Sequence, residues 1–270
     1  MRLTKHHGLG NDFLVALAAD NDGAIEPDDR VSIHLCDRRR GIGADGLLWG
    51  LPPRNPAGAE LRMVLHNSDG SEAEISGNGI RCLAQAALRL DGLDAGTLRV
   101  ETAAGLRTVE VTRGDRVDTI VASVDMGAVT DGPPLPPAVT EWGAHHVASL
   151  TIGNPHLVLH VDSLESIRAE IDGAALQSMV PGSINVHFLT VTDSGRIELV
   201  HFERGAGVTE ACGSGASAAA VAAVQWELTG PTVAVGMPGG DAVVTVSHHD
   251  GEFSASLRGP AQFVGEVIVP

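Results

Sequence analysis

Residues 74–79 read EISGNG, and the pattern recurs in altered form as EACGSG at residues 210–215. A strand-like run and a polar turn precede each copy. A run of good helix formers follows each one, over residues 80–90 after the first copy and to about Leu228 after the second. Each copy is therefore predicted to be a glycine-rich loop that opens a helix.

The two loops indicate that the chain contains a duplicated architecture. Their equivalent positions, Ser76 and Cys212, lie 136 residues apart in a chain of 270 residues. That period is too long for a solenoid and suits the duplication of a whole domain. Alternating runs that are typical of strands occupy residues 97–101, 107–111, 117–124, 156–161, 185–191 and 196–201. Each half is expected to be an α+β unit with many strands and one principal helix.

The boundary between the halves is less well marked. The proline-rich stretch 132–137, GPPLPP, is typical of a stiff exposed connection, and it suits an excursion near a domain boundary as well as a surface loop. The last strand-like run, 261–269, is free to pair with the first half. We predict a first domain of residues 1–115 plus 259–270 and a second domain of residues 116–258.

Charge and hydropathy exclude several classes of function. The chain has 18 Lys and Arg against 34 Asp and Glu, a formal net charge of −16, and such a surface repels nucleic acid and anionic lipid. No apolar run approaches the roughly 20 residues that span a bilayer, and the N-terminal residues lack the apolar core of a signal peptide. We therefore expect a globular cytoplasmic protein with no nucleic-acid or membrane partner.

The three cysteines do not form a recognisable framework. Cys36, Cys82 and Cys212 are far apart, with no CxxC and no histidine at metal-ligand spacing, so neither disulfides nor a metal site is predicted. Cys36 and Cys82 are expected to be core thiols. The match of residues 41–46, GIGADG, to GxGxxG follows charged residues instead of a hydrophobic strand, and no dinucleotide site is expected there.

Cys212 is the candidate reactive thiol. A loop that opens a helix leaves backbone N–H groups unpaired at the positive end of the helix dipole, which suits a small carboxylate. The same location is expected to lower the thiol pKa from about 8.5 and so to make Cys212 a base near neutral pH. The alternative is that Cys212 is a small buried core residue and Ser76 a helix cap.

Motifs spread in order over nearly the whole chain resemble the diaminopimelate epimerase family. They are residues 5–13 (KHHGLGNDF), 37–46 (DRRRGIGADG), 67–72 (NSDGSE), 77–82 (GNGIRC), 153–156 (GNPH), 203–205 (ERG) and 211–215 (ACGSG). The resemblance implies an α+β fold of two pseudo-symmetric mixed α/β domains, each a curved sheet around a central helix, with the active site in the cleft between them. It also implies a homodimeric isomerase that needs no cofactor and converts LL-2,6-diaminopimelate to the meso isomer, for lysine and peptidoglycan precursors.

The resemblance also implies roles for individual residues. Cys212 and Ser76 would exchange protons with opposite faces of the α-carbon, with His156 and Glu203 near them to tune protonation. The implied substrate ligands are Asn11, Asn67, Gly77, Asn78, Asn154, Asn185, Glu203, Arg204, Gly213 and Ser214. No metal is implied.

Ser76 is the main departure from the family, which has cysteine in this loop. A serine hydroxyl is a far weaker acid than a thiol, and a helix dipole does not ionise it at neutral pH. Two smaller departures are Gly46, where many relatives carry a glutamine that contacts substrate, and Ser214 in place of threonine.

Three hypotheses remain open from the sequence. The first is a diaminopimelate epimerase that uses Cys212 with Ser76. The second is an epimerase or lyase of the same fold that acts on another amino acid with Cys212 as its sole base. The third is a non-catalytic protein that binds amino acids. Asparagines at both ends of the predicted cleft favour a small substrate with two amino-acid heads, and hence the first hypothesis.

Overall fold

The computed structural model describes residues 1–23 and 25–270, which divide into two compact units. Unit 1 comprises Met1–Asp125 with Arg258–Pro270, and unit 2 comprises Met126–Leu257. None of the helices in this described part combines the length and the hydropathy that a membrane span requires.

The chain passes between the units inside two long strands, β8 (Thr119–Asp131) and β15 (Glu252–Ile268). The first passage follows Asp125, instead of residue 115, because β8 is one continuous strand whose two ends pair in different units. Val124 pairs with β7 in unit 1, whereas Thr130 pairs with β9 in unit 2.

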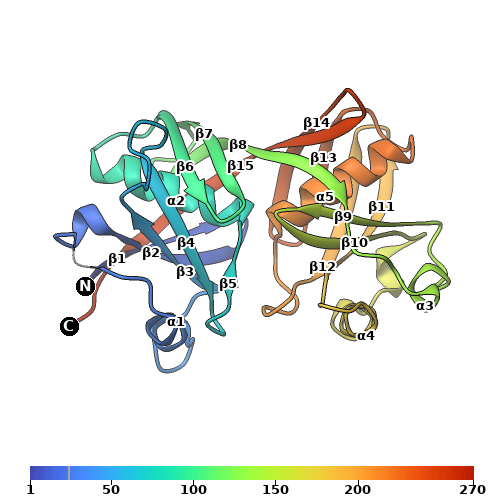
Figure 1. Cartoon of the computed structure of the whole chain (residues 1–270), viewed down its shortest axis with the longest axis horizontal. Helices are drawn as coiled ribbons and strands as arrows, with labels where there is room; N and C mark the ends of the chain where they lie inside the picture. The colour runs from blue at the N-terminus through green and yellow to red at the C-terminus, as the bar shows by residue number, and fades with distance from the viewer. Residues whose placement is uncertain (24) are drawn as a thin grey trace. The chain divides into compact units, whose positions relative to one another are not determined.

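Unit 1 is a curved sheet around one helix, α2 (Gly77–Leu90) (Figure 1). Its order is β15-β1-β2-β3-β4-β6-β7-β8, and the Phe263 N–H donates to the Asp118 carbonyl at 2.9 Å, which ties β15 back to the start of β8. Helix α2 packs against β1, β2, β3, β4 and β7. The remaining strands are β1 (Arg2–Gly8), β2 (Asn11–Leu17), β3 (Gly46–Leu51), β4 (Leu61–Asn67), β5 (Glu72–Ala73), β6 (Gly96–Thr102) and β7 (Gly105–Arg113).

Unit 2 repeats this plan around helix α5 (Gly213–Gln225), in the order β8-β9-β10-β11-β12-β13-β14-β15. The parallel pairs fall at the same two steps of the series, β2–β3 and β4–β6 in unit 1 and β10–β11 and β12–β13 in unit 2. The duplication predicted from the two glycine loops is confirmed by this shared order. The added strands are β9 (His146–Ile152), β10 (Asn154–His160), β11 (Asn185–Asp193), β12 (Arg196–Phe202), β13 (Thr232–Met237) and β14 (Gly240–His249).

Smaller helical elements lie outside the two central helices. Four of them are the helices α1 (Asp29–Cys36), α3 (Pro137–Thr140) and α4 (Ala174–Met179) and the π-helical turn η3 (Ala169–Gly173). Two 3-10 turns, η1 (Ala18–Asp20) and η2 (Leu164–Ser166), complete the set among the described residues.

The two central helices, α2 and α5, are buried in different ways. Helix α5 is alanine-rich and fully buried over its first three turns, so strands can approach it on every side. Helix α2 buries three polar side chains, Asn78, Arg81 and Gln85. Gln85 is satisfied by the Asp118 carbonyl at 2.9 Å and by the His6 ring at 2.9 Å. Asn78 and Arg81 are treated below.

The structure also tests the predictions made for the C-terminal strand, for Cys36 and Cys82, and for residues 41–46. The C-terminal strand β15 pairs antiparallel with β1, from Arg2 opposite Ile268. Cys36 and Cys82 are buried as predicted, and burial raises the pKa of each thiol to about 12. Residues 41–46 lead into β3 and open no helix.

The proline-rich stretch 132–137 follows the first passage between the units by a few residues and is half-buried to exposed, and it is fixed by hydrogen bonds. The Gly132 N–H donates to the Ser149 carbonyl at 2.8 Å, and the Ser149 hydroxyl donates to the Pro133 carbonyl at 2.7 Å. Leu135 is half-buried against the core cluster of unit 2. The stretch is therefore fastened to β9 and leads into α3.

Candidate active site

Ser76 and Cys212 cap the two central helices in the same way. The Ser76 hydroxyl oxygen accepts the Gly79 N–H at 3.0 Å, and the Cys212 sulfur accepts the Gly215 N–H at 3.4 Å. Both residues are extended, with φ of −133° and −127°. Each side-chain atom therefore sits at the positive end of a buried helix, so that capping and a role toward a ligand are compatible at both positions.

The pKa of the Cys212 thiol is raised well above its ordinary value, so the expectation of a lowered pKa is wrong. Burial of the sulfur disfavours the thiolate, and the neighbouring Glu203 carboxylate disfavours it further. The Gly215 N–H and the Ser214 hydroxyl, 3.8 Å from the sulfur, act in the opposite direction and are outweighed. Cys212 is a neutral thiol at pH 7 in this structure.

Glu203 is held by a partly buried chain of hydrogen bonds from His201 through Thr209, which the sequence did not reveal. The Thr209 hydroxyl donates its single hydrogen to the Glu203 carboxylate. His201 Nε2, 2.8 Å from the Thr209 oxygen, must then be the donor to it. Burial lowers the pKa of His201 to about 4, so the ring is neutral with its proton on Nε2.

A second chain of hydrogen bonds holds Asn154. His156 Nε2 lies 2.8 Å from the Asn154 carbonyl oxygen and therefore donates to it, so His156 Nδ1 accepts from His187 Nε2 at 2.9 Å. Burial lowers the pKa of His156 to about 3 and that of His187 well below its ordinary value. This chain of hydrogen bonds occupies the carbonyl oxygen of Asn154 and leaves its amide nitrogen as the group to meet a ligand.

His187, which sequence reasoning missed, packs directly on the start of α5. A Cβ placed on Gly215 would lie 2.0 Å from His187 Cε1. We expect Gly215→Ala to lower the free energy of unfolding by roughly 3 kcal/mol, since overpacking a core displaces neighbouring rings. Denaturant unfolding measures this, and Gly230→Ala, where the nearest atom is 3.9 Å away, is the control. Equal unfolding midpoints for the two variants would contradict the packing described here.

The neutral buried histidines predict acid sensitivity. Burial lowers the pKa of His6 to about 4, as it lowers those of His156 and His201, whereas unfolded histidine titrates near 6.5. Between those values the unfolded chain binds more protons, so stability is complete above pH 6.5 and falls as the pH drops toward 4. Each histidine contributes about 2 kcal/mol of this loss by pH 5.

Urea unfolding at a series of pH values measures the loss. His201→Gln keeps an N–H donor for Thr209 and removes one titrating ring, so its stability should fall less steeply with acid than that of the parent chain. A stability that stays flat from pH 7 to pH 5 would contradict the prediction.

Asn185 supports the loop that carries Glu203 and Arg204. Its Nδ2 donates to the Pro155 carbonyl at 3.3 Å, and its Oδ1 accepts the Arg204 backbone N–H at 2.8 Å. The Glu203 N–H also donates to the Gly207 carbonyl at 2.7 Å and closes the loop. Both polar atoms of the predicted ligand Asn185 therefore form hydrogen bonds with backbone groups in this structure.

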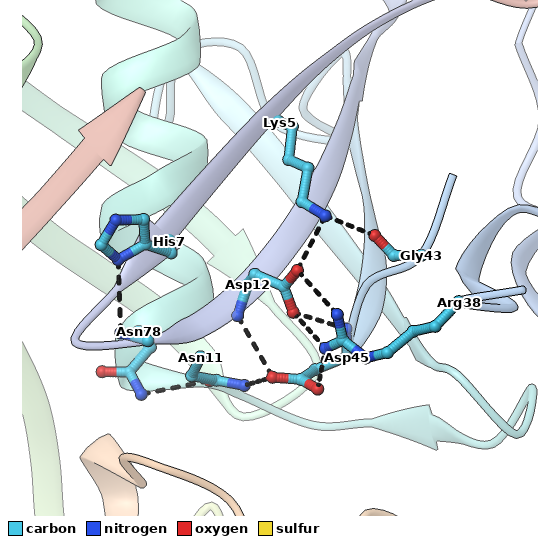
Figure 2. Close-up of polar contacts among 9 residues, drawn as sticks. Lys5, His7, Asn11, Asp12, Arg38, Gly43, Asp45 and Asn78 are labelled. Carbon is cyan, nitrogen blue, oxygen red and sulfur yellow. Dashed lines mark hydrogen bonds and ion pairs between the residues drawn. The ribbon is translucent and has the colours of Figure 1, made fainter. Parts of the chain in front are cut away.

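In unit 1 the predicted ligands Asn11 and Asn78 meet beside Ser76 and Gly77, where Asn78 Nδ2 donates to Asn11 Oδ1 at 3.1 Å (Figure 2). Asn67 ends β4 opposite Gly46, and its amide donates to the Ser71 hydroxyl at 3.0 Å. A Cβ on Gly46 would lie 2.8 Å from the backbone oxygen of His66. A side chain at residue 46 therefore requires a shifted backbone.

The structure thus gathers the predicted residues into one group in each unit. Within residues 1–23 and 25–270, no three His, Cys, Asp or Glu side chains are grouped to hold a metal ion. The group in unit 1 is Ser76, Gly77, Asn78 and Asn11, with Asn67 on the neighbouring β4. The group in unit 2 is Cys212, Gly213, Ser214, Glu203, Arg204, Asn185, Asn154 and His156.

Comparison with known proteins gives this arrangement a family. A family model described as diaminopimelate epimerase matches residues 3–131 and 148–264, which include both capped helices. The chain belongs to the diaminopimelate epimerase family. Proteins named diaminopimelate epimerase from Prochlorococcus marinus (strain MIT 9313) and Methanothermobacter thermautotrophicus are 36% and 34% identical, over 97% and 98% of this chain and 90% and 97% of theirs. This epimerase is accordingly an isomerase.

Solved structures support the same fold. A hydroxyproline epimerase from Agrobacterium vitis aligns with a TM-score of 0.75 at 17% identity, over 99% of this chain and 91% of that one. A predicted epimerase from Pseudomonas aeruginosa aligns with a TM-score of 0.76 at 18% identity, over 99% and 98% of the two chains. The α+β fold of two pseudo-symmetric domains, predicted for this diaminopimelate epimerase family member, is confirmed.

Proposed function

We propose that this epimerase converts LL-2,6-diaminopimelate to the meso isomer, with Cys212 and Ser76 as the groups that exchange the α-proton. The observation that carries the proposal is the matched pair of capped helix N-termini, one ending in a thiol and one in a hydroxyl, in a chain of this family. Each N-terminus offers backbone N–H donors and a positive dipole to an anion.

The chemistry at Cys212 depends on Glu203. The Glu203 carboxylate raises the pKa of the thiol, together with burial. A substrate α-ammonium group paired with Glu203 cancels that negative charge, and the pKa of Cys212 falls when the substrate binds. The Cys212 thiol then loses its proton to solvent, and the resulting thiolate takes the α-proton and becomes a thiol again. This thiol returns a proton to the α-carbon in the reverse direction.

The α-proton of an amino acid is a very weak acid, and the carbanion needs stabilisation. In the proposed complex the α-carboxylate accepts N–H groups at the starts of α2 and α5, from Gly77, Asn78, Gly213 and Ser214. Donors fixed in a water-excluded site stabilise the developing charge at little reorganisation cost. Glu203 and Arg204 are proposed as the charged part of the cradle that binds the α-carboxylate and α-ammonium groups. The polar ligands proposed to read the substrate, its distal amino-acid head included, are Asn11, Asn67, Asn154 and Asn185.

Ser76 is the weaker partner in this scheme. Its hydroxyl delivers a hydrogen to the face opposite Cys212 and must regain one, because an alkoxide is not stable at neutral pH. A second candidate function follows from this weakness. In that scheme the same fold exchanges the α-proton of an amino acid through Cys212 alone.

Incubation with LL-diaminopimelate in deuterated buffer tests both candidates. Formation of the meso isomer with one α-deuterium supports the inverting pair. Deuterium gained with retained configuration supports Cys212 as the only competent group. Absence of both signals would overturn diaminopimelate as the substrate.

We also propose, from the family resemblance, that the product serves lysine and peptidoglycan precursor synthesis. A cytoplasmic homodimer that needs no cofactor belongs to the same proposal. The −16 net charge supports a small-molecule substrate in place of nucleic acid or membrane.

A further inference from the structure

An ionic cluster lies beside Asn11 in unit 1 (Figure 2). Lys5 Nζ lies 2.9 Å from an Asp12 oxygen and donates to the Gly43 carbonyl at 2.6 Å. Arg38 donates to both Asp12 oxygens, at 2.6 and 3.2 Å, and to Asp45 at 2.8 Å. Burial raises the pKa of Asp12, but Arg38 and Lys5 outweigh it and hold that pKa below its ordinary value. The cluster therefore keeps the Asp12 carboxylate charged.

Asp45 sets the orientation of the Asn11 amide. Its Oδ2 accepts Asn11 Nδ2 at 2.7 Å and also the Asp12 backbone N–H at 3.1 Å. A carboxylate accepts hydrogen bonds and cannot donate them, so the NH₂ end of Asn11 must face Asp45. The carbonyl oxygen of Asn11 consequently faces Asn78 Nδ2.

Arg81 sets the orientation of the Asn78 amide, as Asp45 does for Asn11. Its Nη2 donates to the Asn78 carbonyl oxygen at 2.6 Å, Nη1 to the Gly77 carbonyl at 3.0 Å and Nε to the Pro260 carbonyl at 3.2 Å. A guanidinium donates and cannot accept, so Asn78 must present its oxygen to Arg81. The amide polarity is therefore dictated from both ends, by a carboxylate and by a cation.

Arg81 also carries a buried positive charge. The side chain is fully buried, and among the described residues its hydrogen bonds go to the neutral oxygens of Pro260, Gly77 and Asn78. Burial lowers its pKa to about 10, which still leaves it charged at neutral pH. A buried cation bonded only to neutral oxygens is costly unless an anion nearby compensates it. A substrate carboxylate at the start of α2 is such an anion.

We propose that Asp45 and Arg81 are positioning residues that fix the polarity of the Asn11–Asn78 amide pair, so that Asn11 offers an N–H group, and not its oxygen, to a substrate carboxylate. The inference rests on the proposed function for the identity of that carboxylate. It assigns Asp45 no contact with the reacting atoms.

Asp45→Asn tests the proposal because it changes one oxygen to a nitrogen at constant volume. Asn11 then loses the acceptor that holds its NH₂ end, and only the Arg81 end, through Asn78, still favours one orientation. We expect KM for LL-diaminopimelate to rise about tenfold with a smaller change in kcat, which corresponds to the loss of one hydrogen bond to a charged group. Glu60→Gln is the matched control, since it makes the same kind of change in the exposed ion pair with Arg99. An unchanged KM in Asp45→Asn would overturn the proposal.

A swapped variant separates positioning from stability. Asn11→Asp with Asp45→Asn keeps the net charge and the hydrogen bonds of residue 11 to residues 45 and 78, because the carboxylate then at position 11 accepts from both neighbouring amides. The bond from the Asp12 N–H to residue 45 is lost in this variant as it is in Asp45→Asn. We expect its melting temperature to return toward that of the parent chain while KM stays raised at least tenfold, since residue 11 now presents only acceptors. Recovery of both quantities together would show that Asp45 is merely structural.

A measurement without substrate distinguishes failure of this inference from failure of the proposed function. The side-chain amide of Asn11, observed by NMR in ¹⁵N-asparagine-labelled protein, should show one hydrogen bonded to a carboxylate in the parent and in Glu60→Gln, and should lose that signal in Asp45→Asn. An unchanged signal in Asp45→Asn overturns the inference. A changed signal in a protein that neither exchanges nor binds LL-diaminopimelate overturns only the function.

Discussion

Cys212→Ala should lower the rate of α-proton exchange by on the order of 10³-fold, because it removes the only thiol that caps a central helix. The chain should still fold, since the lost cap bond to Gly215 costs about 1 kcal/mol. Deuterium wash-in to the α-position of LL-diaminopimelate, followed by mass spectrometry, measures the rate.

Cys82→Ala is the matched control for this variant. It removes a thiol of equal size, also fully buried, from the other central helix. We expect Cys82→Ala to have a lower free energy of unfolding and an unchanged rate of α-proton exchange. We expect Cys212→Ala to have a strongly reduced exchange rate and only a small loss of stability. Exchange that survives in Cys212→Ala would remove the basis for the proposed chemistry.

Local patterns were enough to predict most of the architecture. The glycine loops at residues 74–79 and 210–215 marked both central helices, because an N-cap followed by helix formers is a short-range signal. Strand-like runs marked β6, β7, β8, β10, β11 and β12. Strands β8 and β12 alternate between a buried and a more exposed face, whereas β10 and β11 are buried over four or five consecutive residues. The duplication then followed from the spacing of the two loops.

The interior of the site was not predictable, because it depends on strand register. His156 is placed opposite Asn185 by the parallel pair β10–β11, and His187 opposite His201 by the antiparallel pair β11–β12. These three histidines lie in three separate strand-like runs, and no local signal tells which runs are neighbours. The four histidines in these runs, His156, His160, His187 and His201, are the available hint, and a role is proposed from the sequence for His156 alone.

The direction of the Cys212 pKa shift was not predictable from the sequence either. A helix N-terminus lowers a thiol pKa when solvent or cations surround it. Here a carboxylate from the loop after β12 and full burial reverse the direction. The direction of the pKa shift therefore depends on burial and on Glu203. The sequence shows the motif that contains Glu203, but it does not show how close Glu203 lies to the Cys212 sulfur.

Ser76→Cys should raise the rate of meso-diaminopimelate formation by about 10²-fold, the typical contribution of a well-matched acid or base. A thiol can both lose and regain a proton near neutral pH, which the serine hydroxyl cannot do. The loop should accept the sulfur, because the equivalent Cys212 makes the same cap bond at 3.4 Å where Ser76 makes it at 3.0 Å. Chiral separation of the products over time measures the rate.

Ser76→Ala completes the comparison, because it removes the hydroxyl and keeps the backbone. If Ser76 delivers the second proton, the alanine variant should stop forming the meso isomer while Cys212 continues to exchange deuterium with retained configuration. A slower Ser76→Cys variant would instead mean that the start of α2 is built around a hydroxyl. In that case the proton at this face would have to come through a hydrogen-bonded partner of the serine, because the hydroxyl alone is too weak an acid.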